Sequence, residues 1–508
     1  MGKGNKKRFA QVKNRHRLLV LIWVLQLVAE ALACYGIWEL NMLPEKYFII
    51  LGAAMAVLAF LTALLLLPVR TGRLQAGMGV FLSVIIFGLS CAASWMVLDA
   101  RGTIDSVVGQ VSSKASAGVY VRAEDRAHDL QDAADYRFGL INGYEMQRFG
   151  EAVAAMEETL GTTMSVSYYD GSQALLNAFF GGEVDALIVN SAYVDIFEEL
   201  DGYEDFRSRV RLIHEEKLNS WSSVLEGMNA NKPQKGASIT TDPFVIYLSG
   251  SDTRNQTLAT SRSDVNILVV VNPETKQILL LNTPRDYYIP NPVSSAGTKD
   301  KLTHCGIYGI ECSMEALAKL YDVEVDYYAQ INFTGFETLI DAIGGITVYS
   351  EKAFVTNDKY QIVAGENTLN GAQALSFARE RKHLSGGDND RGKNQMKVIQ
   401  AVIDKMTSGT TLLTNYSDIM ASLEGMFATS MAMNEISSLM KMQLNDMAAW
   451  NIQSYAVTGY NGSDYTYSAP GTKLYVMYPN DNDVARAKSL IDMVWDGTIL
   501  TEEVMSAN

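Results

Sequence analysis

The sequence predicts an α/β protein with three N-terminal transmembrane helices, a small α/β accessory domain and a larger α-β-α sandwich. Three observations predict this. Three apolar stretches fill most of the first 98 residues, and strand and helix patterns alternate from residue 106 to 229. A longer alternation of buried strands and helices starts at residue 243. A chain of 508 residues is also too long for one domain, so we expect several.

The apolar stretches cover residues 18–38, 47–67 and 78–98, and together they define a membrane section at 18–98. Each is long enough to cross the hydrocarbon core of a bilayer as a helix. Residues 1–17 hold seven Lys or Arg and no acid, and are predicted to form a basic cytoplasmic tail. The first stretch is too long for a signal peptide that is removed, and it lacks a small-residue cleavage site.

The loops between these stretches predict the orientation in the membrane. The loop after the second stretch carries Arg70 and Arg73, whereas the loop after the first carries Glu39, Glu45 and a single Lys46. Lys and Arg mark the cytoplasmic side of a membrane protein. We therefore expect a cytoplasmic N-terminus and an extracellular chain beyond residue 98.

Charge and motif content exclude several function classes. Residues 1–98 carry ten basic and three acidic side chains, a balance of +7; the whole chain has −15, which leaves −22 for the rest. Such an acidic external part does not resemble a nucleic-acid binder. The sequence contains no HExxH, CxxC or GxSxG motif, so zinc sites and Ser-His hydrolases have little support.

The predicted accessory domain spans residues 99–229 and shows no catalytic constellation. Its acids, Glu183, Asp185 and Asp195 among them, are interpreted as solvated surface. A polar segment at 230–241 is the predicted linker to a second external domain at 242–508. The expected strands are 117–121, 165–169, 184–189, 243–249, 266–271, 277–282, 326–333 and 344–348, and the expected helices are 149–160, 172–180, 313–321, 335–343 and 391–406.

Charged residues in the second external domain gather at strand ends. Asp252 follows the first strand, Arg262 and Asp264 precede the second, and Arg285 follows the third. Ligand sites of α/β sheets are commonly built at such places. Two carboxylates there suit Mg²⁺, which binds through one or two carboxylates and substrate phosphates. The alternative is that these acids cap turns and pair with the neighbouring arginines.

The segment 370–395 concentrates positive charge in this acidic chain. It holds Arg379, Arg381, Lys382, Arg391 and Lys393. Guanidinium groups offer paired donors that match phosphate oxygens, so the cluster suits a polyanion. Arg391 lies four residues before Gln395 and would share a helix face with it, near a helix start that also attracts phosphate. A solvated, charged helix start is the alternative.

Two cysteines lie in the external part. Cys305 and Cys312 have six residues between them. Outside the cell the environment is oxidising, and we predict a disulfide between them, with two buried free thiols as the alternative.

Several motifs together resemble one known family. They are GSDTR, RSDVNILVV, LLLNTPRDYYI, DKLTH, NFTGFETLIDAIGGI, LNGAQALSFARERKH and GDNDRGKNQ, and they run in order from residue 250 to 395. Their order and spacing resemble the LytR–CpsA–Psr family of cell-wall glycopolymer ligases. The three spans and the extra domain look like the capsule-attaching members of that family.

The resemblance implies a phosphotransferase in the cell membrane whose large C-terminal part is extracellular. It would move a capsular polysaccharide or teichoic-acid-type polymer from an undecaprenyl phosphate or pyrophosphate carrier onto a peptidoglycan sugar hydroxyl. Mg²⁺ would assist, with Mn²⁺ as a substitute. The implied partners are the lipid-linked polymer, peptidoglycan, the membrane and proteins of polymer synthesis, with no nucleic acid.

The resemblance also implies roles for single residues. Asp252 and Asp264 match the metal-holding acids, and Asp388 matches an acid that orients or deprotonates the incoming hydroxyl. The segment 387–391 departs from the family pattern after Asp388, so Asp390 is an alternative for that role. Arg285, Arg379 and Arg381 are the implied catalytic cations. The implied pyrophosphate contacts are Arg262, Arg285, Lys301, Arg379, Arg381, Arg391 and Gln395.

A lipid groove is the remaining implication of the resemblance. Phe333, Phe336, Ile340 and Ile343 are expected to border it, with packing in the sheet core as the alternative. Two other functions also fit the sequence. One is a membrane-anchored regulator or scaffold that binds polyprenyl phosphate without turnover, and the other is a lipid pyrophosphatase with water as the acceptor.

Overall fold

The computed structural model describes residues 3–40, 43–69, 72–107, 116–142, 146–218, 238–251, 258, 261–294, 296–384, 387–408 and 415–506. The chain divides into two compact units. The first comprises residues 1–108, 413–424 and 431–448, and the second comprises 109–412, 425–430 and 449–508. The predicted linker at 230–241 lies largely outside the described residues, so that boundary stays a prediction.

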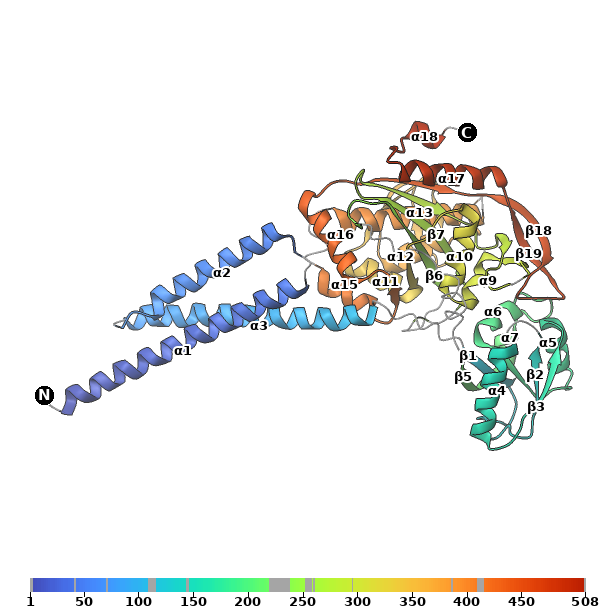
Figure 1. Ribbon diagram of the computed structural model, residues 1–508, viewed down its shortest axis with the longest axis horizontal. Coiled ribbons are helices and arrows are strands. Elements are labelled where there is room, and N and C mark those ends of the chain that lie inside the picture. The colour runs from blue at the N-terminus through green and yellow to red at the C-terminus, as the bar shows by residue number, and fades with distance from the viewer. Residues whose placement is uncertain are drawn as a thin grey trace. The chain divides into compact units, whose positions relative to one another are not determined.

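Three long helices form most of the first unit: α1 (Lys3–Leu40), α2 (Glu45–Leu66) and α3 (Arg73–Val107) (Figure 1). Stretches of 27, 22 and 26 residues within them are long and apolar enough to cross a membrane. Large apolar side chains such as Phe60 and Phe81 are exposed on them, as a lipid environment requires. The three predicted spans are thus confirmed as apolar helices, which supports membrane anchoring. The helices α15 (Tyr416–Leu423) and α16 (Met433–Asp446) belong to the same unit.

The small domain, residues 116–218 of the second unit, is built on one five-stranded sheet. The parallel strands of its β-α-β repeat pair in the order β3-β2-β4, and β1 and β5 extend the sheet antiparallel. The strands are β1 (Ser116–Arg122), β2 (Arg137–Ile141), β3 (Ser165–Tyr169), β4 (Ala186–Asn190) and β5 (Val210–Lys217). The helices are α4 (Met146–Leu160), α5 (Ser172–Phe180), η1 (Ser191–Tyr193), α6 (Val194–Phe197) and α7 (Phe206–Arg209). The predicted small α/β module is confirmed.

The large domain, which comprises the rest of the second unit from residue 238, has a six-stranded sheet in the order β16-β11-β6-β7-β8-β17. Strand β6 runs parallel to β11 and antiparallel to β7, so the carboxyl ends of β6 and β11 meet at one edge. The strands are β6 (Phe244–Ser251), β7 (Val265–Asn272), β8 (Gln277–Asn282), β11 (Tyr327–Asn332), β16 (Phe427–Thr429) and β17 (Asn451–Ala456).

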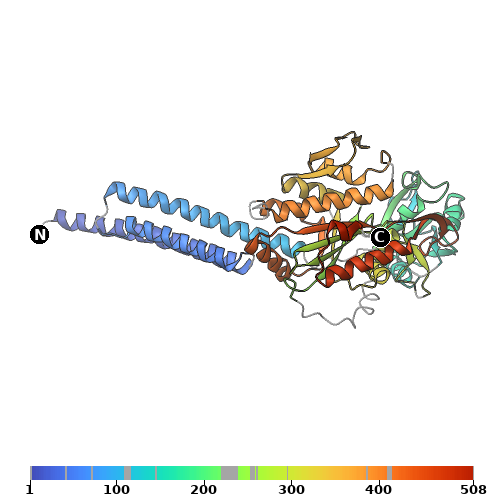
Figure 2. The ribbon, with the colours of Figure 1, turned by 90° about the horizontal axis from the view of Figure 1, so that it is seen from above.

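Helices cover both faces of this sheet. Leu268 and Val270 of β7 pack with Leu317 of α10 (Ile310–Tyr321) and Leu490 of α17 (Asp481–Trp495) in one apolar cluster. Successive strand residues point to opposite faces, and the other face lies under α11 (Phe333–Ala342), α12 (Gly371–Arg379) and α13 (Asp388–Thr407), which line one cavity together with Leu248 of β6 and Ile331 of β11. Figure 2 shows α13 in orange and α17 in red, with strands between them. The predicted α-β-α sandwich is confirmed.

Short elements complete the large domain. They are β9 (Tyr288–Pro290), β10 (Lys299–Lys301), α9 (Leu302–Cys305), η2 (Gly306–Tyr308), β12 (Ile346–Ser350), β13 (Phe354–Val355), β14 (Gln361–Ile362), β15 (Gly365–Leu369), β18 (Gly459–Tyr465), β19 (Lys473–Pro479) and α18 (Glu502–Ser506).

One apolar cluster continues from the small domain into the large domain. It joins Leu176 and Phe197 of the small domain to Ile307 and Leu281 of the large domain, all buried. Burial of apolar surface at about 25 cal/mol per Å² is the main attraction between such surfaces. The two domains of the second unit therefore pack as one body.

The predicted disulfide is not formed in the structure. Cys305 and Cys312 are both buried free thiols. Cys305 lies at the end of α9 and Cys312 in the first turn of α10, where its Sγ is 3.5 Å from Oδ1 of Asn291. Contact with the Cys312 thiol and burial raise the pKa of the Cys305 thiol well above its usual value. Cys305 therefore stays protonated, and both cysteines pack as small buried free thiols, the alternative to the disulfide.

Candidate active site

A cavity of about 320 Å³ lies on the α12 and α13 side of the large sheet. We call it the arginine pocket, because Arg285, Arg379, Arg381 and Arg391 line it. Gly250 and Asn332 line it at the carboxyl ends of the parallel strands β6 and β11, where α/β sheets commonly bind ligands. Its other lining residues are Leu248, Ser249, Asp264, Val265, Ile331, Phe333, Phe336, Leu375, Ala378, Gln395 and Ile399. The pocket thus combines four cations with an apolar wall.

Helix α13 brings two of the predicted phosphate ligands into the pocket. Arg391 and Gln395 share one face of its first turns, and each side chain is largely buried. Gly392 lies between them, and a side chain there would collide with the amide of Asn282 at the end of β8. The glycine therefore allows the start of α13 to approach the sheet closely, with its free N–H groups near the pocket.

The start of α13 also carries two acids, Asp388 and Asp390. The backbone of Asp388 begins α13, and its side chain lies outside the described residues. Asp390 is described, does not line the pocket, and has Oδ1 3.9 Å from Nζ of Lys393. The choice between Asp388 and Asp390 as the acid that handles the acceptor proton therefore stays open.

Arg379 and Arg381 flank a buried carboxylate. Helix α12 starts with a capping box between Asn370 and Gln373 and ends at Arg379. The next residue, Glu380, is 1% exposed and accepts hydrogen bonds from the backbone N–H groups of Asn357, Arg381 and His383. Burial would raise the Glu380 pKa, but the N–H donors of His383 and Asn357 outweigh it and lower that pKa.

Glu380 therefore fixes the turn that holds the two arginines, although it is not among the described residues that line the arginine pocket. Sequence reasoning missed it; an acid between two arginines was the available signal. The Arg379 guanidinium also lies 4.6 Å from the ring centre of Phe333, a cation–π contact that orients it.

Asp264 is the described carboxylate of the arginine pocket. Its Oδ1 accepts a hydrogen bond of 2.8 Å from Nη1 of Arg285, and its side chain is 15% exposed. Burial would raise the Asp264 pKa, but Arg285, Arg262 and Arg391 together lower it. Asp264 is therefore ionised at neutral pH.

The donor set decides what kind of metal site would fit. A single carboxylate, that of Asp264, suits Mg²⁺, because this ion can take its remaining ligands from substrate phosphate and water. Within the described ranges, no group of three or more His, Cys, Asp or Glu side chains could hold a metal ion. Asp264 thus fits an ion shared with a substrate, and the predicted second ligand, Asp252, lies outside the described residues.

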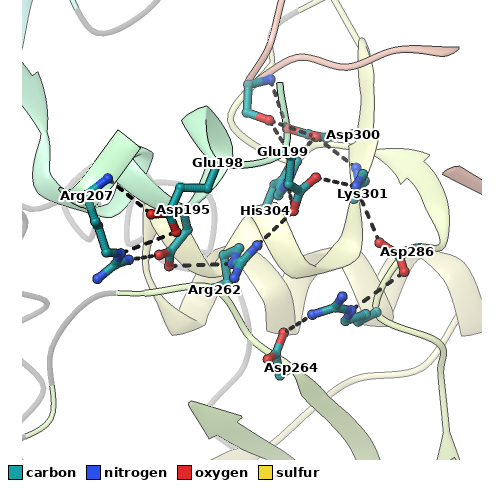
Figure 3. Close-up of polar contacts among 12 residues, drawn as sticks. Asp195, Glu198, Glu199, Arg207, Arg262, Asp264, Asp286, Asp300, Lys301 and His304 are labelled. Carbon is teal, nitrogen blue, oxygen red and sulfur yellow. Dashed lines mark hydrogen bonds and ion pairs between the residues drawn. The ribbon is translucent and has the colours of Figure 1, made fainter. Parts of the chain in front are cut away.

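Two predicted phosphate ligands are not in the pocket. Figure 3 shows Arg262 and Lys301 directed at acids that the small domain supplies from α6 and the residues after it. Arg262 donates to Oε1 of Glu199 over 2.7 Å, and its Nε lies 3.5 Å from Asp195. Lys301, 4% exposed at its side chain, donates to Oε2 of Glu199 over 2.5 Å. We call this group of contacts the acidic contact.

The acidic contact corrects one interpretation of the sequence. Asp195 was interpreted as solvated surface, yet its side chain is 13% exposed and it pairs with both Arg207 and Arg262. Asp195 and Glu199 are four residues apart, and that spacing was the signal that could have joined them.

A buried histidine extends the acidic contact. His304 is 0% exposed, its Nδ1 lies 2.9 Å from Asp300 and its Nε2 lies 3.8 Å from Glu199. Burial opposes its charge, but the carboxylates of Asp300 and Glu199 raise the His304 pKa above its usual value. For Glu199, burial is likewise outweighed by His304 and Lys301, so its pKa is strongly lowered. Sequence reasoning gave no role to Asp300 or Glu199.

Ser468, His304 and Asp300 do not form a hydrolase triad. Ser468 Oγ lies 2.7 Å from Nδ1 of His304, and Asp300 contacts the same nitrogen. In a triad the acid orients the ring through one nitrogen and the other nitrogen takes the serine proton, so the two residues contact different ring nitrogens. The group is therefore a packed structural network.

The predicted lipid groove divides into two parts. Phe333 and Phe336 line the arginine pocket from the start of α11. Ile340 and Ile343 are 0% and 1% exposed and do not line it. For these two, packing in the core is what the structure shows.

Known proteins resemble the chain over this region. The LytR_cpsA_psr family model matches residues 214–482. A protein of Halalkalibacterium halodurans named polyisoprenyl-teichoic acid–peptidoglycan teichoic acid transferase TagU is 34% identical over 43% of this chain and 70% of its own length. The TagU of Bacillus subtilis (strain 168) is 31% identical over 51% of this chain and 79% of its own.

A solved structure described as TagT bound to LIIa-WTA is also similar to the chain. It is 26% identical, covers 52% of this chain and 94% of its own, and has a TM-score of 0.41. The family match spans more than half of the chain and includes the arginine pocket, the buried Glu380 turn and the cations of the acidic contact. The chain belongs to the LytR_cpsA_psr family.

Proposed function

We propose that this protein transfers a glycopolymer from an undecaprenyl phosphate or pyrophosphate carrier onto a sugar hydroxyl of peptidoglycan. The polymer is of the teichoic-acid type or a capsular polysaccharide. The main observation behind this proposal is the arginine pocket. Apolar side chains line one side of this cavity, and it is also lined by Arg285, Arg379, Arg381 and Arg391. Curated relatives named as teichoic acid transferases support the reaction class.

The composition of the pocket suits a phosphate that carries a lipid. Guanidinium groups bind phosphate oxygens through paired donors, and Phe333, Phe336 and Ile399 offer apolar surface to the adjoining prenyl units. A purely charged cleft would suit a soluble anion equally well. The mixed lining therefore supports a prenyl-linked substrate.

Phosphoryl transfer requires positioning and charge neutralisation more than covalent chemistry. The acceptor oxygen forms a bond to the phosphorus attached to the polymer. With a pyrophosphate carrier, the bond from that phosphorus to the bridging oxygen breaks, and the carrier leaves as prenyl phosphate. With a monophosphate carrier, the bond to the prenyl oxygen breaks, and the carrier leaves as prenyl alcohol. The acceptor proton passes to a carboxylate, for which the start of α13 offers Asp388 or Asp390. The four arginines neutralise charge on the phosphate oxygens.

Asp264 would hold Mg²⁺, with Mn²⁺ as a substitute, together with substrate phosphate oxygens. When bound, the ion would withdraw charge from those oxygens and favour attack on phosphorus. The hydrogen bond from Arg285 fixes the Asp264 carboxylate in its orientation. Asp252 remains a candidate for the second protein ligand.

The proposed place of action is the outer face of the cell membrane. The three apolar helices of the first unit would anchor the enzyme where the lipid carrier lies. The basic residues at the N-terminus and in the loop before α3 support a cytoplasmic N-terminus and an external large domain. Proteins of polymer synthesis are the proposed further partners.

The test uses the full chain in detergent micelles with Mg²⁺, a prenyl-pyrophosphate-linked oligosaccharide and peptidoglycan fragments. Mass spectrometry detects the joined product. Arg381→Ala removes a pocket cation, and Lys382→Ala is its control, since Lys382 is the neighbouring exposed cation and does not line the pocket. Asp264→Asn tests the proposed metal ligand.

Joined product from the wild type and Lys382→Ala, with little from Arg381→Ala, would support the proposal. Release of prenyl phosphate without joined product would contradict it in favour of a pyrophosphatase. Bound lipid that remains unchanged would contradict it in favour of a scaffold.

A further inference from the structure

A second cavity, of about 270 Å³, lies within the second unit at the carboxyl ends of β2 and β4 of the small domain. Residues of the large domain after β18 close its other side, among them Ser468 and Pro470. The contact is tight: a side chain at Gly171, just before α5, would collide with the carbonyl of Pro470. The size lies just below the range of about 300–1,000 Å³ of small-molecule pockets, so a ligand would be small.

Asn190, the last residue of β4, lines this cavity and has an unused donor. It is 1% exposed, and its Oδ1 accepts a hydrogen bond from the backbone N–H of Ala192 over 3.1 Å, which starts the η1 turn. Among the described residues, none accepts a hydrogen bond from its buried Nδ2. Leaving a buried donor unpaired is costly, so such a group calls for an acceptor.

The other residues that line the cavity indicate the chemistry of the ligand that would carry this acceptor. The described residues that line the cavity carry no charged side chain, which disfavours an ionic ligand. Phe149, Tyr193 and Tyr308 supply aromatic surface, and the hydroxyl groups of Tyr193 and Tyr308 contact each other over 2.9 Å across the two domains. Aromatic faces beside one amide donor suit a ring with an apolar C–H face and a neutral oxygen acceptor.

We propose that this aromatic cavity binds a single uncharged sugar, with an acetamido or hydroxyl oxygen on Asn190 Nδ2. The choice of a sugar rests on the proposed function, because that function brings neutral N-acetylated sugars of the wall to the protein. The cavity itself does not rest on it. The site is separate from the arginine pocket, since the two share no lining residue.

The test measures equilibrium binding of N-acetylglucosamine to the full chain in detergent micelles by ligand-detected NMR. Glucosamine and glucuronic acid are the cationic and anionic comparisons. Asn190→Asp keeps the Oδ1 acceptor for Ala192 and removes the donor. Asn177→Asp is the matched control: Asn177 is exposed on α5 of the same domain, and its Oδ1 accepts from Tyr203, a role that Asp retains.

We expect saturable binding of N-acetylglucosamine by the wild type and Asn177→Asp, weakened about tenfold or more by Asn190→Asp. The charged sugars should bind more weakly than the neutral one. Ile141→Trp, which fills the cavity from the end of β2, should abolish binding even if Asn190→Asp does not fold. Absence of binding to the wild type, or binding that both cavity variants leave unchanged, would overturn the proposal.

Arg379→Ala separates this site from the proposed catalytic one. Sugar binding should persist in that variant, because Arg379 lines the other pocket. Loss of sugar binding in Arg379→Ala would contradict the proposal that the aromatic cavity binds sugar independently of the arginine pocket. Sugar binding without any polymer transfer would leave the aromatic cavity in place and count against the proposed function alone.

Discussion

Four arginines of the large domain face an open cavity, whereas Arg262 and Lys301 of the same domain face carboxylates of the small domain. All six are cations near strand or helix ends, and the sequence predicts a phosphate contact for all six. Their neighbours differ. In the arginine pocket the cations have room for a substrate anion, while in the acidic contact Glu199 already supplies the oxygen atoms that a phosphate would bring. The role of a cation here depends on what the adjoining domain places opposite it.

The largest effect should come from a cation of the arginine pocket. Arg379→Ala should lower the rate of joined-product formation about 100-fold or more, the usual loss for one charge-stabilising donor in a transition state. The fold should be unaffected, because the Arg379 side chain is exposed. Product formation by mass spectrometry gives the rate, with Lys382→Ala as the control. An unchanged rate in Arg379→Ala would remove the distinction between the two groups of cations.

Glu199→Gln tests the cations of the acidic contact, Arg262 and Lys301. It should loosen the contact between the domains by about 1–3 kcal/mol, less than a fully buried pair would lose, since Glu199 is 22% exposed at its side chain. Hydrogen exchange should rise in α6 and in β10, which carries Lys301. Glu204→Gln, an exposed acid of the same domain, should leave exchange unchanged. Tighter binding of prenyl phosphate by Glu199→Gln, with unchanged exchange, would show that Arg262 and Lys301 are substrate ligands instead.

The difference between the two groups also explains what the sequence could predict. Arg391 and Gln395 were placed on one face because helix geometry links residues four apart, and the structure confirms it. The partner of Arg262 is Glu199, which is 63 residues earlier and belongs to another sheet. Local spacing holds no information on such a pair. The strand and helix pattern is local in the sequence, so it predicts each sheet. For the same reason it cannot predict how the two domains contact each other.

Apolar residues show the same limit on a smaller scale. Phe333, Phe336, Ile340 and Ile343 were assigned together to a groove, but only the two phenylalanines reach the pocket. Amphipathic spacing identifies the buried face of a helix and cannot tell a cavity wall from a core. For Cys305 and Cys312, the oxidising environment outside the cell predicts a disulfide, whereas the structure has two buried free thiols.

The acidic contact should also depend on pH. The His304 pKa is raised above its usual 6.5, so the charged ring stabilises the fold fully below pH 6.5 and loses this effect as pH rises through the raised pKa. The Glu199 pKa is lowered below its usual 4.5, so its contribution is complete above pH 4.5 and is lost in stronger acid. The stabilisation should thus be greatest between these two values.

Thermal unfolding of the full chain between pH 5 and 9 measures this dependence. His304→Gln should reduce the decline of the unfolding temperature above pH 6.5. His128→Gln, an exposed histidine of the small domain, is the control and should keep it. Equal declines in all three proteins would show that His304 is not the titrating group of the contact.

The smallest effect should come from the ring that orients Arg379. Phe333→Leu keeps an apolar wall and removes the cation–π contact of 4.6 Å, worth about 0.5–1 kcal/mol at a partly exposed site, so prenyl-phosphate affinity should fall about two- to fivefold. Phe333→Tyr keeps the aromatic face and should bind as the wild type does. Equilibrium binding of a fluorescent prenyl phosphate gives both values. If leucine and tyrosine bound equally well, the apolar wall alone would account for Phe333, and Arg379 would need no ring to hold it toward the phosphate.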